Sequence, residues 1–349
     1  MILVVCLNPA LDVTHHVERV DWAGVNRPTA VYSRPGGKGI NVARTLHALG
    51  AEVVLLGLAG GPTGSVVEAE LDALGLRTAF TRIAGDTRRT FTVVDASSAA
   101  GRGAVALFNE PGPQISAAEW DEFRARYSRV LAVAARPGSA AVVLSGSLPP
   151  DLPANAYATL IVMAEAEGVP TLLDTSGAAL QHAIAAGPHI VKPNLDELAA
   201  LSAGQTHDSG RLGTRECAQT STIMAAAAVR EAGAQSVVVS LGPEGLLAVT
   251  GDGCWHARPQ AVVTGNATGA GDAVVAALAH GLVFGRPWPG RLRHAVALGA
   301  ATVASPVAGE FVSADYAAGM ETAAVLEIPA APGSTPHQPQ SSCQEQEKR

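Results

Sequence analysis

The stretch Thr264-Gly265-Asn266-Ala267-Thr268-Gly269-Ala270-Gly271-Asp272 runs directly into the apolar sequence Ala273-Val274-Val275-Ala276-Ala277-Leu278. A turn-like segment before such a run is typical of a loop that enters a helix. Glycines at 269 and 271 would leave backbone N–H groups uncovered at the N-terminus of that helix. Because these groups and the helix dipole favour negative charge, the stretch predicts an anion site that suits a triphosphate.

Asp272 stands beside this predicted anion site, where a carboxylate is electrostatically unfavourable unless it has a chemical role. It is well placed to accept a proton from an attacking hydroxyl group, as the base in a phosphoryl transfer. The alternative is an aspartate that caps a helix after a glycine turn, since short glycine motifs recur by chance. Other parts of the chain have to decide between the two.

The composition indicates a folded, globular protein. Of its 349 residues 48% are hydrophobic and 16% are charged, which is enough to bury one large core or two modest ones. No segment has the roughly 18 unbroken apolar residues of a membrane span, and the start lacks a basic region and a cleavage site. We therefore expect a cytoplasmic protein without a membrane partner. The net charge of −7 argues against a nucleic-acid partner.

Short apolar runs of strand length recur along the chain, and their apolarity is continuous rather than alternating. They cover residues 2–7, 53–58, 141–145, 171–174, 190–192 and 236–241. Helix-length stretches lie between or after them, at residues 39–49, 64–74, 117–135, 154–167, 219–231, 270–282 and 291–304. Continuous apolarity suits parallel strands that are buried on both faces. The alternation predicts an α/β fold with a mainly parallel central sheet.

Two segments interrupt this alternation. Residues 13–33 and 87–108 carry alternating residues without a helical period, which predicts antiparallel strands outside the main sheet. They are expected to pair into a small lid over the strand ends, where α/β folds bind ligands. Residues 204–215 form a polar excursion. Residues 329–349, rich in Pro, Ser and Gln, are expected to be a disordered tail after one folded domain at 1–328.

A second glycine-rich loop, Pro35-Gly36-Gly37-Lys38-Gly39, precedes another apolar-periodic run. Its glycines would let a ligand approach the backbone closely, and Lys38 adds a positive charge at the same place. Asn41 would lie one helical turn further on. The alternative is a tight strand-to-helix turn with a lysine that faces solvent. The loop differs from the GxxxxGK[ST] pattern of the P-loop.

Further polar residues follow predicted strands. Asp12 is placed to accept hydrogen bonds from sugar hydroxyls or to cap a turn. Arg88 and Arg89 precede an alternating strand, so one of them should face inward, where a guanidinium suits a phosphate, although arginines are also common at surfaces. Asn194 and Glu197, one helical turn apart, suit a magnesium ion directly or through water, but the same spacing fits a helix cap. The glycines after Ser240 fit a nucleotide loop or a hairpin turn.

Taken together and in order, these segments resemble the ribokinase-like (PfkB-type) carbohydrate kinases over about residues 1–315. The segments that carry the resemblance are Asn8-Pro9-Ala10-Leu11-Asp12, Gly37-Lys38-Gly39-Ile40-Asn41-Val42-Ala43, Ser145-Gly146-Ser147-Leu148-Pro149, Lys192-Pro193-Asn194-Leu195-Asp196-Glu197-Leu198, Ser240-Leu241-Gly242 and Gly269-Ala270-Gly271-Asp272. The resemblance implies a three-layer α/β/α fold with a small β lid. The branch containing 1-phosphofructokinase and tagatose-6-phosphate kinase is the most similar.

The resemblance also implies a role for each candidate residue, with ATP and Mg²⁺ as cofactors. Asp272 would be the base, and the anion hole would comprise Gly269, Ala270 and Gly271. The sugar phosphate would be held by Asp12, Gly37, Lys38, Asn41 and Arg88. The nucleotide would contact Asn194, Ser240, Gly242 and Gly245, while Glu197 and Asn194 would organise the metal, through water. The chain departs from the family pattern at Asn266, Ala267, Thr90 and Asp151.

These roles together predict a kinase for the primary hydroxyl of a ketohexose monophosphate, with fructose 1-phosphate as the first choice. Tagatose 6-phosphate, fructose 6-phosphate and an unphosphorylated sugar remain alternatives, as does a sensor that binds a sugar phosphate without catalysis. A homodimer through the lid is expected, because an unpaired sheet edge favours association and the family suggests one.

Overall fold

A computed structural model describes residues 1–97, 104–136, 139–202, 215–305 and 309–329. Its central sheet contains, in spatial order, β14 (Ala324–Ile328), β13 (Cys254–Arg258), β12 (Leu246–Val249), β11 (Val237–Ser240), β10 (Ile190–Val191), β9 (Thr171–Asp174), β8 (Ala141–Ser145), β1 (Ile2–Cys6), β4 (Val53–Gly60) and β5 (Arg77–Ile83). The strands from β11 to β5 are parallel. The strands β12, β13 and β14 extend the sheet in antiparallel pairing.

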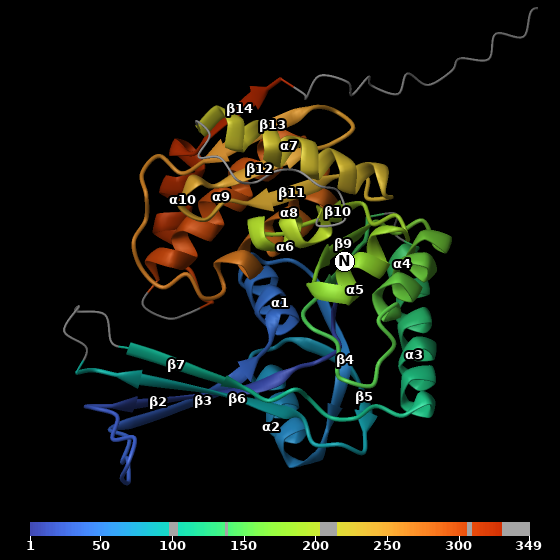
Figure 1. Cartoon of the computed structure of the whole chain (residues 1–349). Coiled ribbons are helices and arrows are strands. Elements are labelled where there is room, and N and C mark those ends of the chain that lie inside the picture. The colour runs from blue at the N-terminus through green and yellow to red at the C-terminus, as the bar shows by residue number, and fades with distance from the viewer. Residues whose placement is uncertain (98–103, 137–138, 203–214, 306–308, 330–349) are drawn as a thin grey trace, which may run out of the picture.

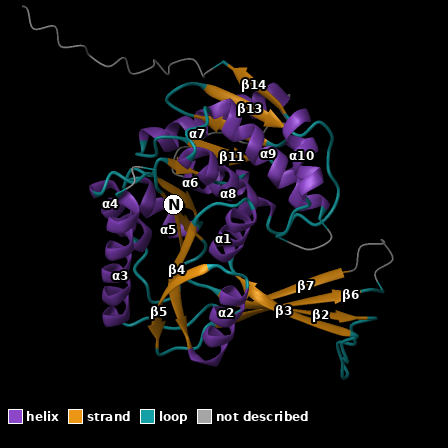
Figure 2. Cartoon of the chain, turned by 180° about the vertical axis from the view of Figure 1, so that it is seen from behind, coloured by secondary structure: helices purple, strands orange, loops and turns teal. Residues whose placement is uncertain are grey.

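Helices cover both faces of this sheet (Figures 1 and 2). One face packs against α3 (Ala117–Ala135), α4 (Ala156–Ala166), α5 (Gly177–Ile184), α6 (Leu195–Ser202) and α7 (Arg215–Glu231). The other packs against α1 (Lys38–Ala48), α2 (Gly61–Ala73), α8 (Ala270–Val283) and α9 (Trp288–Ala304), with α10 (Ser313–Thr322) beside α9. The predicted three-layer α/β/α fold with a mainly parallel sheet is confirmed.

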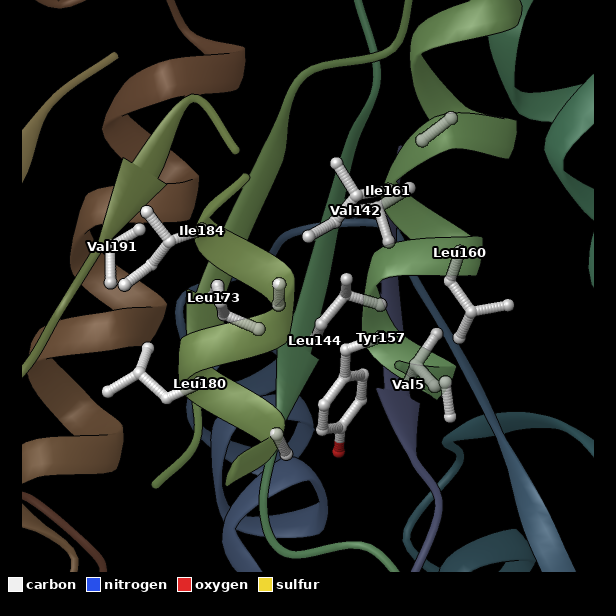
Figure 3. Packing of buried hydrophobic residues seen from close by; sticks show 14 of the residues in the cluster. Val5, Val142, Leu144, Tyr157, Leu160, Ile161, Leu173, Leu180, Ile184 and Val191 are labelled. Carbon is white, nitrogen blue, oxygen red and sulfur yellow. The ribbon is translucent and has the colours of Figure 1, made fainter. Parts of the chain in front are cut away.

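The continuous apolarity of the strands follows from burial on both faces. Along β1, Leu3 and Val5 belong to one hydrophobic cluster, whereas Ile2 and Val4 belong to the cluster on the opposite face. Figure 3 shows the first cluster, in which side chains of the sheet meet those of α4 and α5. Such packing on both sides fixes the strand ends rigidly, and these ends carry the candidate site.

The lid is a second, four-stranded sheet that projects from the core in Figure 1. Its spatial order is β3 (Ala30–Gly36), β2 (Ala10–Val17), β6 (Arg88–Asp95) and β7 (Ala104–Asn109). The prediction of purely antiparallel strands was wrong in one pairing, because β2 and β6 are parallel. The reason is that the chain enters β2 from β1 and β6 from β5. These core strands point the same way, so the chain leaves them at the same edge of the sheet.

Several elements were not anticipated from the sequence, namely β5, β12, β13, β14, α5 and α10. The predicted excursion at 204–215 lies outside the described residues except for Arg215, which begins α7. The predicted tail likewise lies outside them except for Pro329. Among the helices that the structure describes, none has both the length and the apolarity that crossing a membrane requires.

Candidate active site

The N-terminus of α8 is open, as the glycines of this segment predicted. Gly269 is its cap residue, with a φ of 84° in the left-handed region, and no side chain caps the helix. The Ala270 N–H donates to the carbonyl of Ala267 at 3.1 Å. Within the described residues, the N–H groups of Gly271 and Asp272 make no hydrogen bond. Two backbone donors are therefore left for an anion at the positive end of the helix dipole.

Asp272 lies in the first turn of α8 and is only 7% exposed. Its Oδ2 accepts a hydrogen bond of 2.9 Å from Nδ2 of Asn41, on α1. Burial and the nearby carboxylate of Asp174 raise the pKa of Asp272 to about 7, although Asn41, Lys38 and Lys192 act to lower it. A carboxylate with a pKa near neutrality is suited to exchange a proton with a substrate hydroxyl.

Asp174 was not predicted as a site residue, yet it lies at the centre of the charged cluster. It ends β9, and its carboxylate is 3.1 Å from Nζ of Lys192 and 3.5 Å from Nζ of Lys38. Asp174 and Lys192 are both buried. The only sequence signal for Asp174 is a carboxylate at the carboxyl end of a buried strand, where parallel sheets place their ligands. It holds two cations toward the same place.

Lys38 is the first residue of α1 and follows Gly37, which caps that helix with a φ of 98°. This left-handed φ is one that few residues other than glycine adopt, so the glycine is required for the turn. Burial acts to lower the pKa of Lys38, but the carboxylates of Asp174, Asp272 and Glu197 outweigh it and raise the pKa. The side chain is 43% exposed, which leaves it accessible to a ligand.

The base of the lid holds the other predicted sugar residues. Asp12 lies on β2, where its Oδ1 accepts a hydrogen bond of 2.6 Å from the Thr90 hydroxyl. Arg88 begins β6 and donates through Nε to the carbonyl of Asn8 and through Nη1 to that of Glu110, both at 3.2 Å. Its Nη2 makes no hydrogen bond within the described residues. Arg88 also lines a pocket of about 900 Å³, together with residues 84–86 and 110–116.

Asn194 and Glu197 cap each other at the start of α6. The Asn194 N–H donates to Oε2 of Glu197 at 2.9 Å, and the Glu197 N–H donates to Oδ1 of Asn194 at 2.8 Å. The capping alternative is therefore present in the structure. Asn194 is exposed and Glu197 is half-buried, so a role toward a hydrated metal is compatible with it. Among the described residues, no group of three or more His, Cys, Asp or Glu side chains is placed to hold a metal ion.

The predicted nucleotide loop is the turn of a hairpin. Ser240 ends β11 and pairs with Asn194, and the chain then passes through a short 3₁₀ turn, Gly242–Glu244, into β12. Gly245 has a φ of 89° at the end of this turn. Within the described residues, no hydrogen bond or ion pair links Gly242 or Gly245 to Asp272. The Ser240 N–H donates to the carbonyl of Pro193 at 3.0 Å, one residue after Lys192.

The structure therefore brings five charged or polar side chains together at the carboxyl edge of the sheet. They come from α1, from α8, from the end of β9 and from the position just after β10. These are Lys38, Asn41, Asp174, Lys192 and Asp272. Two cations, two free helix N–H groups and one carboxylate of raised pKa form a set that can bind a phosphoryl group beside a base.

Comparison with known proteins agrees with this chemistry. Residues 1–314 match the family described as pfkB family carbohydrate kinase. A 1-phosphofructokinase of Xanthomonas campestris pv. campestris is 39% identical over 285 residues, which are 80% of this chain and 84% of that protein. A tagatose-6-phosphate kinase of Staphylococcus epidermidis is 30% identical over 286 residues, 81% of this chain and 86% of that protein.

A solved structure supports the same assignment. Phosphofructokinase-2 from Escherichia coli, in complex with potassium, superimposes with a TM-score of 0.81 at 30% identity and covers 92% of this chain and 98% of its own. The match of the family pattern to most of the chain and the identity to the Xanthomonas protein each suffice to assign the family. The chain belongs to the pfkB family of carbohydrate kinases.

Proposed function

We propose that this kinase transfers the γ-phosphoryl group of ATP to the primary hydroxyl of a ketohexose monophosphate, with fructose 1-phosphate as its substrate and fructose 1,6-bisphosphate as its product. The observation that carries the proposal is the buried Asp272, with a pKa raised to about 7, at a helix N-terminus with free N–H groups. Such a carboxylate can receive the proton of the attacking hydroxyl while the N–H groups face the transferred phosphoryl group.

A phosphorylated sugar fits the cations at the entrance of the site. Lys38 is partly exposed beside the glycine turn, and Arg88 keeps Nη2 available at the base of the lid. Asp12 and Asn41 would form hydrogen bonds with the sugar hydroxyls. The choice of fructose 1-phosphate over tagatose 6-phosphate rests on identity, since the 1-phosphofructokinase relative is 39% identical and the tagatose-6-phosphate kinase is 30% identical.

ATP and Mg²⁺ are part of the proposal. The open N-terminus of α8 and the buried ammonium of Lys192 suit the phosphates of a nucleotide, and Ser240, Gly242 and Gly245 would adjoin its nucleoside. The half-buried carboxylate of Glu197, with Asn194 beside it, would hold Mg²⁺ through water. Because no three-ligand group is present among the described residues, the metal would arrive with the phosphates. When bound, Mg²⁺ supplies charge neutralisation of the phosphate oxygens.

In the proposed reaction the sugar hydroxyl lies between Asp272 and the γ-phosphoryl group. Asn41 orients the carboxylate through its hydrogen bond, and Asp272 takes the proton as the new P–O bond forms. The bond to the β-phosphate oxygen breaks, and ADP leaves with the electron pair. Lys192, Lys38 and the N–H groups of Gly271 and Asp272 stabilise the charge on the transferred group, so positioning and electrostatics supply most of the catalysis.

The experiment that tests the proposal is ADP release with ATP and Mg²⁺ across fructose 1-phosphate, tagatose 6-phosphate, fructose 6-phosphate and fructose. We expect the highest kcat/KM for fructose 1-phosphate. The Arg88→Gln variant should raise the KM for sugar phosphates by about tenfold or more, as expected for loss of a hydrogen bond to a charged group, and leave that for ATP nearly unchanged. Preference for fructose itself would contradict the sugar-phosphate assignment. Absence of ADP release with every sugar would favour a sensor that binds without catalysis.

The proposal also includes a homodimer through the lid and a cytoplasmic location, where ATP and sugar phosphates occur together. The lid exposes large apolar side chains, namely Val31, Tyr32, Val105, Leu107 and Phe108. These side chains lie on β3 and β7, the two edge strands of the lid, and exposed apolar side chains on an unpaired sheet edge favour association with another copy. Light scattering should give twice the mass of the 35.4 kDa chain. A Tyr32→Ser, Leu107→Ser variant that remained a dimer would place the interface elsewhere.

A further inference from the structure

An ion pair outside the cluster joins α1 to the segment that follows α9. Nη2 of Arg44 lies 3.0 Å from Oε1 of Glu310. The Arg44 side chain is only 16% exposed, whereas that of Glu310 is 49% exposed. A guanidinium so largely removed from water needs a counter-charge, because an unpaired buried charge is strongly unfavourable. Glu310 supplies it.

Glu310 follows a residue that touches the anion hole. Gly309 donates from its N–H to the Thr268 carbonyl at 3.1 Å. A Cβ at position 269 would lie 2.5 Å from Cα of Gly309, so the two backbones are in direct contact. The position of Gly309 therefore bounds the loop that opens α8. One peptide group joins Glu310 to Gly309, so the ion pair and the contact with Gly269 are adjacent along the chain.

Arg44 lies on the same helix as the residues that face the reacting groups. It is three positions after Asn41 and therefore on the same face of α1. Asn41 in turn contacts Asp272, and a Cβ at Gly309 would lie 3.7 Å from Oδ1 of Asn41. The helix α1 and the 309–310 segment thus meet twice, once at Asn41 and once at the Arg44–Glu310 pair.

A second guanidinium makes the counter-charge more important. Arg34, on β3, lies opposite Asp12 in the lid and close to Arg44. Burial and the proximity of Arg44 lower the pKa of Arg34, while Asp12 and Glu310 raise it. Without Glu310, Arg44 would lose its ion-pair partner beside a second cation, while Arg34 would keep Asp12 opposite it. Glu310 pairs with Arg44 and also contributes negative charge near Arg34.

We propose that Arg44 and Glu310 are positioning residues that hold Gly309 against Gly269 and so fix the anion hole of α8 relative to Asn41 and Lys38 on α1. The inference rests on the proposed phosphoryl transfer. A shift of about 1 Å in such a site can lower turnover by about a hundredfold. Loss of the pair should therefore reduce kcat and leave the KM for the sugar phosphate nearly unchanged.

The kinetic test is a double-mutant cycle on Arg44→Gln and Glu310→Gln, with Arg44→Lys as the conservative variant. Each glutamine variant should lower kcat by about tenfold or more, and the double variant should lose no more than either alone. Arg44→Lys should retain most of the kcat. The matched control is Arg77→Gln, which breaks an exposed pair with Glu52 of the same 3.0 Å length far from the site. Additive losses in the cycle, or an equal loss in the control, would overturn the inference.

A binding measurement separates this inference from the proposed substrate. Calorimetric titration with ADP, with and without aluminium fluoride as a planar mimic of the transferred phosphoryl group, does not depend on which sugar is used. Glu310→Gln should bind ADP within about twofold of wild type and lose about tenfold or more in affinity for the fluoride complex. The positioning role would be contradicted if the variant and the wild type bound the fluoride complex with equal affinity, or if the wild type did not bind that complex at all. Absence of turnover with every sugar phosphate would instead contradict the proposed function.

Discussion

Asn41 donates a hydrogen bond of 2.9 Å to Asp272 across 231 positions of sequence. The bond links the first turns of α1 and α8, the two helices that begin in glycine loops. It leaves Oδ1 of Asp272 for another partner while it fixes the plane of the carboxylate. A base held in this way is oriented before the substrate arrives, which is the condition for efficient proton transfer.

The first prediction concerns this base. Asp272→Asn should keep the shape of the side chain but remove the proton acceptor, so kcat should fall by about a thousandfold or more. Affinity for ADP and for the sugar phosphate should stay within a few-fold. The control is Asp315→Asn, an exposed acidic residue in the first turn of α10. Steady-state kinetics and calorimetry check both, and near-normal turnover of Asp272→Asn would refute the mechanism.

The second prediction concerns pH. Because Asp272 acts as a base, kcat/KM should rise with pH through its pKa of about 7 and level off above it. Asp174 raises this pKa, so Asp174→Asn should move the acidic limb of the profile to lower pH. Lys192 lowers it, so Lys192→Gln should move the limb to higher pH. Profiles of kcat/KM from pH 5 to 9 test the two opposite shifts, and a shift of both in one direction would count against Asp272.

The third prediction separates two glycines of the same loop. A Cβ at Gly271 would be 3.9 Å from Nζ of Lys192, which is ordinary contact, so Gly271→Ala should fold normally and yet lower kcat by crowding the anion hole. At Gly269 the Cβ would meet Gly309 and the φ of 84° is strained for alanine, so Gly269→Ala should also lower the melting temperature. Calorimetry and kinetics on both variants distinguish the two effects. Equal melting temperatures would contradict the argument.

The fourth prediction concerns acid stability. His294 on α9 is 1% exposed, and within the described residues neither ring nitrogen has a hydrogen-bond partner. Burial, His280 and Arg286 lower the pKa of His294 to about 4 from its ordinary value of 6.5. Between these values the unfolded chain binds a proton that the folded one does not, so stability falls as pH decreases from 6.5 to about 4. The fall is at most about 1.4 kcal/mol per pH unit for one group.

Replacement of this histidine should remove its contribution to the loss of stability at acid pH. In His294→Phe, the melting temperature should decrease less between pH 7 and pH 5 than in wild type, whatever its value at pH 7. The exposed His182 offers the matched control, and His182→Phe should keep the wild-type slope. An unchanged slope in His294→Phe would mean that other groups cause the acid sensitivity.

Much of the central architecture is visible in the sequence because its signals are local. Continuous apolar runs follow from strands buried on both faces, and glycines before an apolar-periodic segment indicate a helix that begins at a ligand site. For this reason the sequence alone indicated Gly37, Gly269 and Asp272 as candidate site residues. The roles assigned to them stay predictions until the kinetics are measured.

Asp174 could not be predicted as a site residue from the sequence, because its role depends on the spatial order of the strands. It ends a four-residue strand and belongs to no motif, and it becomes central only because β8, β9 and β10 are neighbours in the sheet. The parallel pairing of β2 with β6 could not be predicted for the same reason. Each of these strands forms an antiparallel hairpin with its neighbour in the sequence, and only the fold brings the two hairpins together. The edge strand β14 was missed because a run of five residues, apolar apart from Glu327, does not separate strand from helix by its pattern.

The parallel pairing of β2 with β6 has a consequence for how the protein is made. Each of the two hairpins of the lid is local, but the seam between them joins residues 10–17 to residues 88–95. During synthesis the first hairpin must therefore wait, with one edge open, until β4, α2 and β5 have emerged. An isolated hairpin is marginally stable in water. The sugar side of the site, with Asp12 and Thr90 face to face, can thus form only after these core elements have been synthesised.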